Sequence, residues 1–415
     1  MEKRLYYGWI IAFSCFVAIS ITNGLTISGI TVFDESLLKE FGWSRGGLKF
    51  RATLTFVITG LLAPFSGSLA DRVGARRLMI FGAAMLSVSI YLYSQISTLT
   101  HLYAIHVLFA LTLATCSILT VVFLTSRWFV SRRGFALGFV IVGTSMGGIV
   151  FPMLNTYLNA TYGWRTSFQL LALVPLALVP FLALLVRDKP ADMGLVALGE
   201  ERTASGAPPP LRGLTYQEAI RTPTFWALSV MAFGTFAAIM GIVDHLFLHL
   251  RGLQFTPAEA ARGLSFLFWL GLVGKFLFGY LADVFSPKYV AMTNIAIMLA
   301  GIALLSTLSP ALVLASIALF GFGWGGIYTL IQVLVLGCFG NRAAGTILGT
   351  LIMVEALGGG LGPWIMGLLF DASGNYFSAF ACATALVALA LASSLVVRPF
   401  EADPHTDPRS VRPAA

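Results

Sequence analysis

Long apolar runs recur along the whole chain and constrain its fold more than any other feature. Twelve runs are long enough to cross a bilayer, which takes roughly 20 apolar residues. Backbone groups in lipid must bond within their own segment, so runs of this length are expected to be helices. The runs lie near residues 7–33, 48–70, 76–97, 102–126, 134–158, 164–186, 224–248, 261–282, 288–308, 311–336, 345–369 and 376–397. The sequence therefore predicts an all-α membrane protein with twelve transmembrane helices.

The composition supports the same class. Hydrophobic residues make up 58% of the 415 residues and charged residues only 11%, whereas a soluble domain carries about 25% charged residues. A soluble core of this size would need a charged shell that the chain cannot supply. The net charge of +8 is dispersed along the loops, so we expect no nucleic-acid partner. The four cysteines lie inside apolar runs without the spacing of a metal site, and we expect no cofactor.

The longest polar stretch, residues 187–223, separates the sixth apolar run from the seventh and predicts a linker between two six-helix bundles. The predicted domains are an N-terminal bundle (1–186), the linker (187–223), a C-terminal bundle (224–398) and a short tail (399–415). Lysine and arginine favour the cytoplasmic side of a membrane. Eighteen of them lie in segments on the side of the termini and five on the other side, so both termini are predicted to be cytoplasmic.

A glycine, an acid and basic residues follow the second helix of each predicted bundle, in segments 67–77 and 279–288. The candidate residues are Gly67, Asp71, Arg72, Gly74, Arg76, Arg77 and Asp283. The glycine allows two helices to approach closely. The charges can form a network that breaks and re-forms between two conformations. The alternative is that the basic residues only anchor the topology, but the recurrence at equivalent places favours a gating network.

Segment 67–77 resembles the signature loop of the major facilitator superfamily, and the resemblance extends over residues 6–397. It is closer to one branch, that of the monocarboxylate transporters and oxalate/formate antiporters. The stretches that carry it are Trp128-Phe129, Arg132-Arg133-Gly134, Ala136-Leu137-Gly138, Tyr162-Gly163-Trp164-Arg165, Arg187-Asp188-Lys189-Pro190-Ala191-Asp192-Met193-Gly194, His245-Leu246 and Gly358-Gly359-Gly360-Leu361-Gly362. The resemblance implies two bundles around a central cavity, alternating access to that cavity, and a small organic anion as substrate.

Ionisable residues inside a membrane are costly, and each is a candidate for function. Lys275 lies near the middle of the eighth predicted helix. The resemblance implies a substrate-binding cation at this position, where the branch usually has arginine. A lysine offers a point charge in place of a bidentate fork. The alternative is a structural lysine that pairs with an acid on a neighbouring helix.

Glu355 lies near the middle of the eleventh predicted helix. We expect it to neutralise Lys275 in the empty carrier, directly or through water, and to take up a coupling proton when an anion displaces it. The alternative is a protonated structural acid. Oxalate-type members of the branch carry a second cation at the position of Leu351. Its absence favours a monocarboxylate over a dicarboxylate.

His245 is a further candidate for substrate binding, and Arg51, His106, Asp244 and Ser28 are secondary candidates. His245 suits proton entry because histidine titrates near physiological pH, although an interfacial location explains it equally well. For Asp244 the interfacial location is favoured. Arg51 and His106 are expected to reach the membrane surface with their polar ends. Ser28 occupies the place where the resemblance implies a binding lysine in animal carriers, so that contact is missing.

These features predict a secondary active carrier of small organic anions, with monocarboxylates first, coupled to a proton or a counter-anion. We expect a monomer that spans the lipid bilayer of a bacterial inner membrane many times. The alternative on the same fold is a multidrug or other small-molecule efflux carrier, although a central lysine disfavours cationic cargo. A transport-dead sensor would need a signalling domain, and an enzyme would need a nucleophile–base pair. Neither feature is visible in the sequence, so no enzymatic activity is expected.

Overall fold

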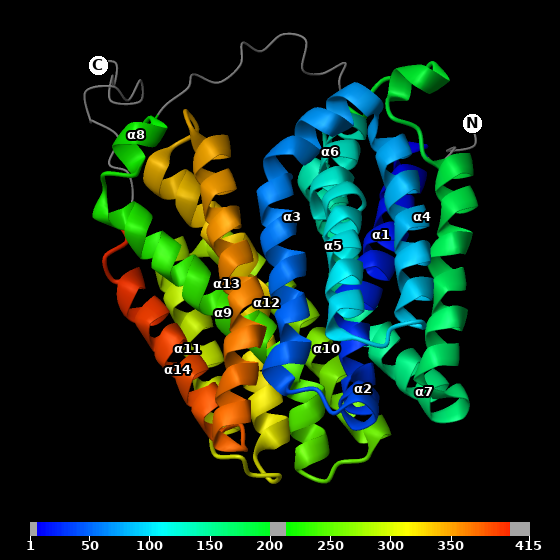
Figure 1. The fold of residues 1–415 in the computed structure, drawn as a ribbon. Coiled ribbons are helices and arrows are strands. Elements are labelled where there is room, and N and C mark those ends of the chain that lie inside the picture. Colours follow the sequence, from blue (N-terminus) through cyan, green and yellow to red (C-terminus); the bar gives the residue numbers. More distant parts are fainter. Residues whose placement is uncertain (1–5, 200–212, 399–415) are drawn as a thin grey trace, which may run out of the picture.

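The computed structural model describes residues 6–199 and 213–398 and forms two groups of helices that stand side by side (Figure 1). The first half contains α1 (Gly8–Asn23), η1 (Gly24–Ser28), η2 (Gly29–Phe33), α2 (Asp34–Phe41), α3 (Arg45–Val73), α4 (Ala75–Tyr93), α5 (Leu99–Thr115), α6 (Ile118–Trp128) and α7 (Arg133–Leu185). The connection contains η3 (Pro190–Met193) and α8 (Tyr216–Ala219). The second half contains α9 (Pro223–Gly252), α10 (Pro257–Val284), α11 (Pro287–Leu305), α12 (Val313–Phe339), α13 (Ala344–Ser373) and α14 (Phe377–Ser394).

The described residues contain eleven helical segments that are long and apolar enough to cross a membrane, and α7 accounts for two crossings. An unbroken helix of its 53 residues would be roughly 80 Å long, far more than the roughly 30 Å of a bilayer core. The backbone leaves the helical conformation at Gly163, with φ 74° and ψ 164°, and the chain turns back there. The expected separation of runs 134–158 and 164–186 is therefore confirmed, and twelve crossings result.

The first crossing is irregular in its second part. After α1 the chain forms a π-helical turn, η1, and then a tight 3₁₀ segment, η2. Gly24 and Gly29 allow this segment to lie directly against α7, since a Cβ on Gly24 would come within 2.1 Å of the Phe151 ring. π-helical turns interrupt α-helices most often at functional sites. Here the irregular segment places Ser28 and Asp34 toward the interface between the halves.

The fourth predicted run, 102–126, is also divided. Helix α5 ends at Thr115, and α6 begins at Ile118. Between them Cys116 has φ −136° and ψ 48°, and Ser117 is extended. Apolar composition continues across this break, so hydropathy alone does not reveal it.

The short helix α8 near the second half has a defined start. Thr215 caps it, and the Glu218 carboxylate accepts hydrogen bonds from the Thr215 backbone N–H at 2.7 Å and hydroxyl at 2.8 Å. These hydrogen bonds hold the pKa of Glu218 below its usual value. The proposed linker boundaries at 187 and 223 and the tail boundary at 399 stay a prediction, and residues 200–212 and 399–415 lie outside the described residues.

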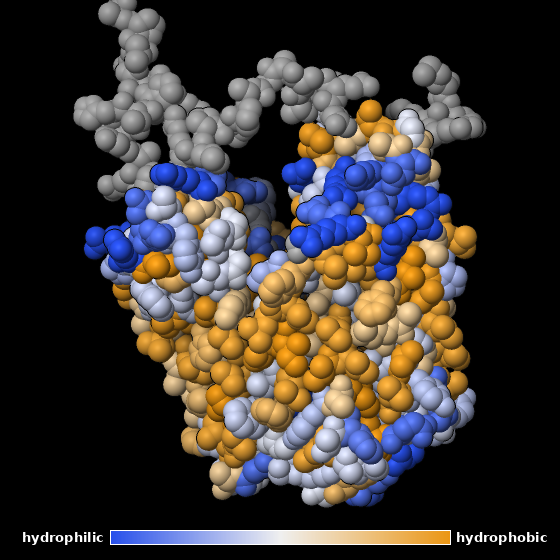
Figure 2. Space-filling model, turned by 45° about the horizontal axis from the view of Figure 1, so that its top comes forward, coloured by the Kyte–Doolittle hydropathy of each residue, from blue (hydrophilic) through white to orange (hydrophobic). Residues whose placement is uncertain are grey.

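Contacts between the halves gather at one end of the molecule, which we call the closed end. There the backbone N–H groups of Arg45 and Gly46 donate to Asp371 at 2.9 and 2.7 Å. Arg251 also binds Glu35, with Nε 2.6 Å from the carboxylate. The open end is the opposite one, where the described chain begins and finishes. At that end Figure 2 shows the surface hollowed between the two halves, above a broad apolar band.

Candidate functional site

A central cavity of about 220 Å³ lies between the halves. Its lining includes polar and aromatic side chains from both halves: Asn23, Ser28, Phe56, Thr144, Phe236, Phe268, Lys275, Trp324 and Tyr328. Most of the lining is apolar. The cavity is smaller than a typical drug-sized pocket of about 300–1,000 Å³. It therefore suits a solute of few heavy atoms.

Lys275 extends from α10 into this cavity and contacts the other half. Its Nζ donates hydrogen bonds to Thr144 Oγ1 at 2.7 Å and to Ser145 Oγ at 2.8 Å, both on α7. Neither hydroxyl carries a charge, and among the described residues no carboxylate lies within 4.0 Å of the ammonium. An ammonium has three N–H groups. One donor and the full positive charge therefore remain for a ligand.

Glu355 is buried in α13, with 5% of its surface exposed, and does not form the expected direct ion pair with Lys275. The direct form of the expected pair is thus absent in this conformation, where two hydroxyls of the facing helix accept from the lysine, and the form through water stays a prediction. Glu355 interacts electrostatically with Tyr328, which lines the same cavity as Lys275. The acid thus belongs to the surroundings of the cavity without contacting its cation.

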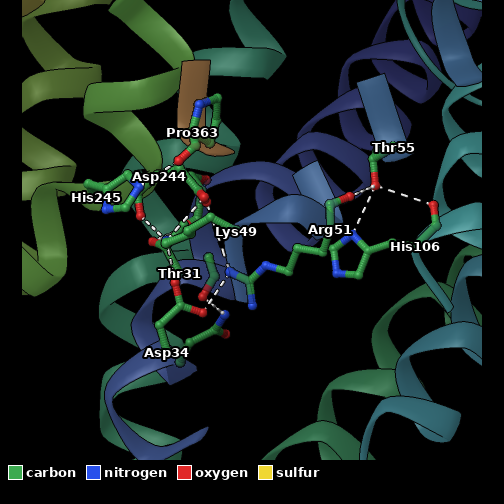
Figure 3. A network of polar contacts seen from close by, with 12 residues as sticks. Thr31, Asp34, Lys49, Arg51, Thr55, His106, Asp244, His245 and Pro363 are labelled. Atoms are coloured by element: carbon green, nitrogen blue, oxygen red, sulfur yellow. Dashed lines mark hydrogen bonds and ion pairs between the residues drawn. The ribbon is translucent and has the colours of Figure 1, made fainter. Parts of the chain in front are cut away.

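A cluster of four charges lies at the closed end and joins the halves (Figure 3). Lys49 Nζ lies 2.5 Å from Asp34 Oδ2 and 3.0 Å from Asp244 Oδ2. Arg51 Nη2 lies 2.6 Å from Asp34 Oδ1 and 3.9 Å from Asp244 Oδ1. Asp34, Lys49 and Arg51 belong to the first half and Asp244 to the second. We call these four residues the closed-end cluster; it contains two acids and two bases.

Because this cluster is buried, breaking one of its ion pairs costs more free energy than breaking an ion pair at the surface. Asp34 and Lys49 are fully buried, and Arg51 is 1% exposed. Removing one partner of a buried pair leaves an uncompensated charge and costs about 3–5 kcal/mol. The expectation that Arg51 reaches the membrane surface is therefore wrong, since Asp34 and the Tyr93 hydroxyl, 3.1 Å from Nη1, hold it inside.

His106 is also buried, contrary to the expected location at the membrane surface. Its Nδ1 lies 2.8 Å from Thr55 Oγ1, and Thr55 sits one helical turn after Arg51. Its Nε2 has no hydrogen-bond partner among the described residues. This nitrogen is thus free for a ligand or water.

Asp244 and His245 lie in the interior of the protein and not at the membrane surface. Asp244 belongs to the closed-end cluster, so the interfacial interpretation is wrong for it. His245 Nε2 lies 2.8 Å from the Pro363 carbonyl oxygen, and Nδ1 lies 3.0 Å from the Tyr376 hydroxyl. A carbonyl only accepts, so Nε2 donates, and a neutral ring accepts from Tyr376 at Nδ1. Arg45 in turn donates to Tyr376, which links this histidine to the first half.

The residues predicted to form an open-end network are only partly connected here. Asp71 pairs with Arg127 at 2.8 Å, and the Arg76 backbone N–H donates to Asp188 at 2.9 Å. Gly74 has φ 92° and ends α3. The residues that are exposed without an ion pair among the described residues are Arg72, Arg77 and Asp283. Gly67 lies within α3, and its role in close packing stays a prediction.

Sequence reasoning missed Asp34 and Lys49, together with Thr144 and Ser145. Asp34 directly follows the first apolar run, and Lys49 lies at the edge of the second, so both resemble ordinary flanking charges. Thr144 and Ser145 lie in the glycine-spaced fifth run, where small residues have a packing explanation. Ser28 lines the cavity as an uncharged group, and its hydroxyl lies 3.4 Å from the Gly24 carbonyl oxygen.

Comparison with known proteins places this architecture in a family. A family model described as the Major Facilitator Superfamily matches residues 9–363. Monocarboxylate transporter 13 of Rattus norvegicus is 26% identical over 386 residues, covering 92% of this chain and 86% of that protein. The oxalate:formate antiporter of Oxalobacter formigenes is 25% identical over 388 residues, covering 87% of this chain and 88% of that protein.

Solved structures share the fold. A bacterial homologue of the human lysosomal transporter Spinster, in an inward-facing and occupied conformation, has a TM-score of 0.72 at 18% identity, covering 95% of this chain and 97% of the other. A D-xylose-proton symporter has a TM-score of 0.73 at 15% identity, covering 94% and 97%. Together with the matching family model, these findings show that the chain belongs to the Major Facilitator Superfamily and is a multi-pass membrane transporter with monocarboxylate and oxalate:formate transporters among its relatives.

Proposed function

We propose that this protein is a secondary active transporter of small organic anions, with monocarboxylates as the first class to test. The observation that carries the proposal is the ammonium of Lys275, which lies in a small central cavity with two hydroxyl partners and no acid within ion-pair distance among the described residues. A positive charge in such a place favours an anionic solute. The cavity volume of about 220 Å³ favours a small one.

The names of relatives agree with this substrate class. Monocarboxylate transporters and an oxalate:formate antiporter align over most of the chain. Leu351, where the resemblance implies a second cation in oxalate-type proteins, is buried and apolar. Lys275 is the one cation among the described residues that line the cavity, and a single cation favours one carboxylate over two.

Coupling to a proton or to exchange with a second anion is part of the proposal. Glu355 is the candidate proton carrier, because it is a buried acid near the cavity without an ion pair among the described residues. It would act through Tyr328 and the cavity water, since the direct contact with Lys275 is absent in this conformation. His245, whose two ring nitrogens both have partners, is better suited to holding the closed end together.

The aromatic lining keeps a second candidate function open. Phe56, Phe236, Phe268 and Trp324 would also suit an apolar solute, as expected for a multidrug efflux carrier. Such a protein would bind neutral or cationic aromatic compounds in preference to carboxylates. The binding experiment below includes one such compound for this reason.

The first prediction concerns binding. The purified protein is screened by thermal shift against formate, acetate, lactate, oxalate and the aromatic cation tetraphenylphosphonium. We expect small monocarboxylates to raise Tm, because a ligand that binds only the folded state stabilises it. Lys275→Gln should reduce this shift. The matched control is Lys288→Gln, since Lys288 lies outside the cavity lining and, among the described residues, donates only to the Leu395 and Val397 carbonyls, at 2.9 and 2.8 Å.

Two results would contradict the proposal. One is an unchanged carboxylate response in Lys275→Gln. The other is a protein that responds to tetraphenylphosphonium and to none of the carboxylates, which would favour the efflux carrier.

A further inference from the structure

The carboxylate of Asp244 occupies a site formed by two cations of the other half. It lies 3.0 Å from Lys49 Nζ and 3.9 Å from Arg51 Nη2. Lys49 also donates to the backbone carbonyl of Asp244. Helix α9 thus presents a carboxylate to a pair of bases on α3, in the way a bound organic anion would present one (Figure 3).

The charges of the cluster are unevenly divided between the halves. Lys49, Arg51 and Asp34 belong to the first half and carry a net charge of +1. Asp244 supplies the balancing charge from the second half. Alternating access requires the halves to part at the closed end. When α9 moves away from α3, the two bases keep only Asp34, and the place of the second carboxylate becomes available.

A small second cavity lies between this place and the central cavity and borders both. It has a volume of about 20 Å³, enough for one water, and its lining includes Arg51, His106 and Asp244. It shares four lining residues with the central cavity: Ile27, Phe56, Met240 and Val243. The buried Nε2 of His106 has no partner among the described residues and provides a further polar contact here. The Arg51 place and the Lys275 cavity are therefore neighbours, separated by the side chains that both cavities share.

We propose that Lys49 and Arg51 form a second carboxylate-binding site, which captures the organic anion when the closed end opens and which Asp244 fills when that end is shut. The site rests on the proposed function, because it assumes an anionic substrate. It adds a first binding step before Lys275. It also explains how a substrate promotes opening, since its carboxylate competes with Asp244 for the same two bases.

The test removes the carboxylate of Asp244 by mutation and offers formate in solution as its replacement. Asp244→Ala removes the internal ligand, and formate then fits between Lys49 and Arg51. We expect formate to raise Tm of Asp244→Ala by more than Tm of the wild type. The extra shift should persist in Asp244→Ala/Lys275→Gln and disappear in Asp244→Ala/Arg51→Gln. The matched control is Asp371→Asn, which alters a closed-end carboxylate bound to backbone N–H groups, and it should show no extra shift.

The proposal is overturned if formate stabilises Asp244→Ala no more than the wild type, or if the extra shift depends on Lys275 and not on Arg51. Failure of the proposed function gives a different result. Carboxylates would then shift Tm of the wild type and of Lys275→Gln equally, whatever the result for Asp244→Ala.

A second measurement serves if Asp244→Ala does not fold. Thr53 donates to the Gly360 carbonyl at 2.8 Å across the closed end, so Thr53→Cys should react with a maleimide only when that end opens. Labelling is corrected for the four native cysteines with the parent protein. We expect formate to accelerate the alkylation of Thr53→Cys, also in the Lys275→Gln background. No acceleration in that background contradicts the second site.

Discussion

Asp34 is the acid that holds both bases of the closed-end cluster within its own half, at 2.5 Å from Lys49 and 2.6 Å from Arg51. Asp34→Ala leaves two buried bases with Asp244 alone. We therefore predict that the free energy of unfolding in detergent falls by about 3–5 kcal/mol, as for other broken buried pairs. The measurement is denaturant unfolding of the purified protein.

A surface pair supplies the comparison for this prediction. Asp71 binds Arg127 at 2.8 Å, but 62% of the Asp71 side chain is exposed. Exposed pairs contribute about 0–1 kcal/mol. Asp71→Ala should therefore lower the free energy of unfolding by no more than that amount. Equal losses in the two variants would show that the closed-end cluster does not stabilise this conformation.

Glu355 is the residue on which proton coupling depends in the proposed function. Glu355→Gln keeps the shape of a protonated carboxyl group but neither takes up nor releases a proton. We predict that the variant retains carboxylate exchange across proteoliposomes and loses accumulation driven by a pH gradient. Accumulation at the wild-type level would remove Glu355 as the proton carrier, and His106, whose Nε2 has no hydrogen-bond partner among the described residues, would be the next residue to test.

At the scale of elements, Gly163 decides that α7 makes two crossings. Its φ of 74° and ψ of 164° fall in a region that is essentially restricted to glycine, where other residues cost about 1–3 kcal/mol. A Cβ there would meet no atom within 4 Å, so the backbone alone sets the cost. We predict that Gly163→Ala lowers the free energy of unfolding by about this amount.

Gly138 lies on the same helix and provides the control for that substitution. A Cβ on Gly138 also meets no atom within 4 Å, and the residue has a helical backbone. Alanine is favoured over glycine in a helix by about 1 kcal/mol. Gly138→Ala should therefore leave stability unchanged or raise it. A loss in both variants would mean that the turn at Gly163 is not the cause.

The crossings could be predicted because hydropathy and length alone define them. The separation of runs 134–158 and 164–186 is an example, since Tyr162-Gly163 interrupts apolar sequence at the right distance. The π-helical turn at Gly24–Ser28 and the break at Cys116 could not be predicted. Both depend on which glycine or side chain faces another helix, and that is a property of tertiary packing.

The candidate site could be predicted only in part: the sequence indicated its cation but not the partners of that cation. Lys275 stands out because a charge in the middle of an apolar run is costly in a membrane and therefore a candidate for function. Its hydroxyl partners are ordinary residues of another helix, so the sequence favoured the visible acid Glu355 instead. The closed-end cluster escaped prediction because Asp34 and Lys49 border apolar runs, where charges normally face water. Only the packing of α2, α3 and α9 shows that they are buried.

At the scale of the whole molecule, the two ends differ in a way that fits alternating access. The closed end contains the buried charges and the contacts of Arg45, Glu35 and Thr53 with the other half. The open end is hollowed between the halves (Figure 2). The lysine and arginine bias predicts that the open end faces the cytoplasm, which would make this an inward-facing state.

The most direct measurement of the central claim is uptake of a radiolabelled monocarboxylate, such as lactate, into proteoliposomes. The vesicles are loaded with unlabelled monocarboxylate in one series, and a pH gradient is applied in another. We predict uptake by the wild type in at least one series, loss of uptake in Lys275→Gln and retained uptake in Lys288→Gln. Absence of uptake by the wild type in both series, across the carboxylates that raise Tm, would contradict the assignment as an organic-anion transporter. Equal uptake by wild type and Lys275→Gln would contradict the assignment of Lys275 as the residue that binds the anion.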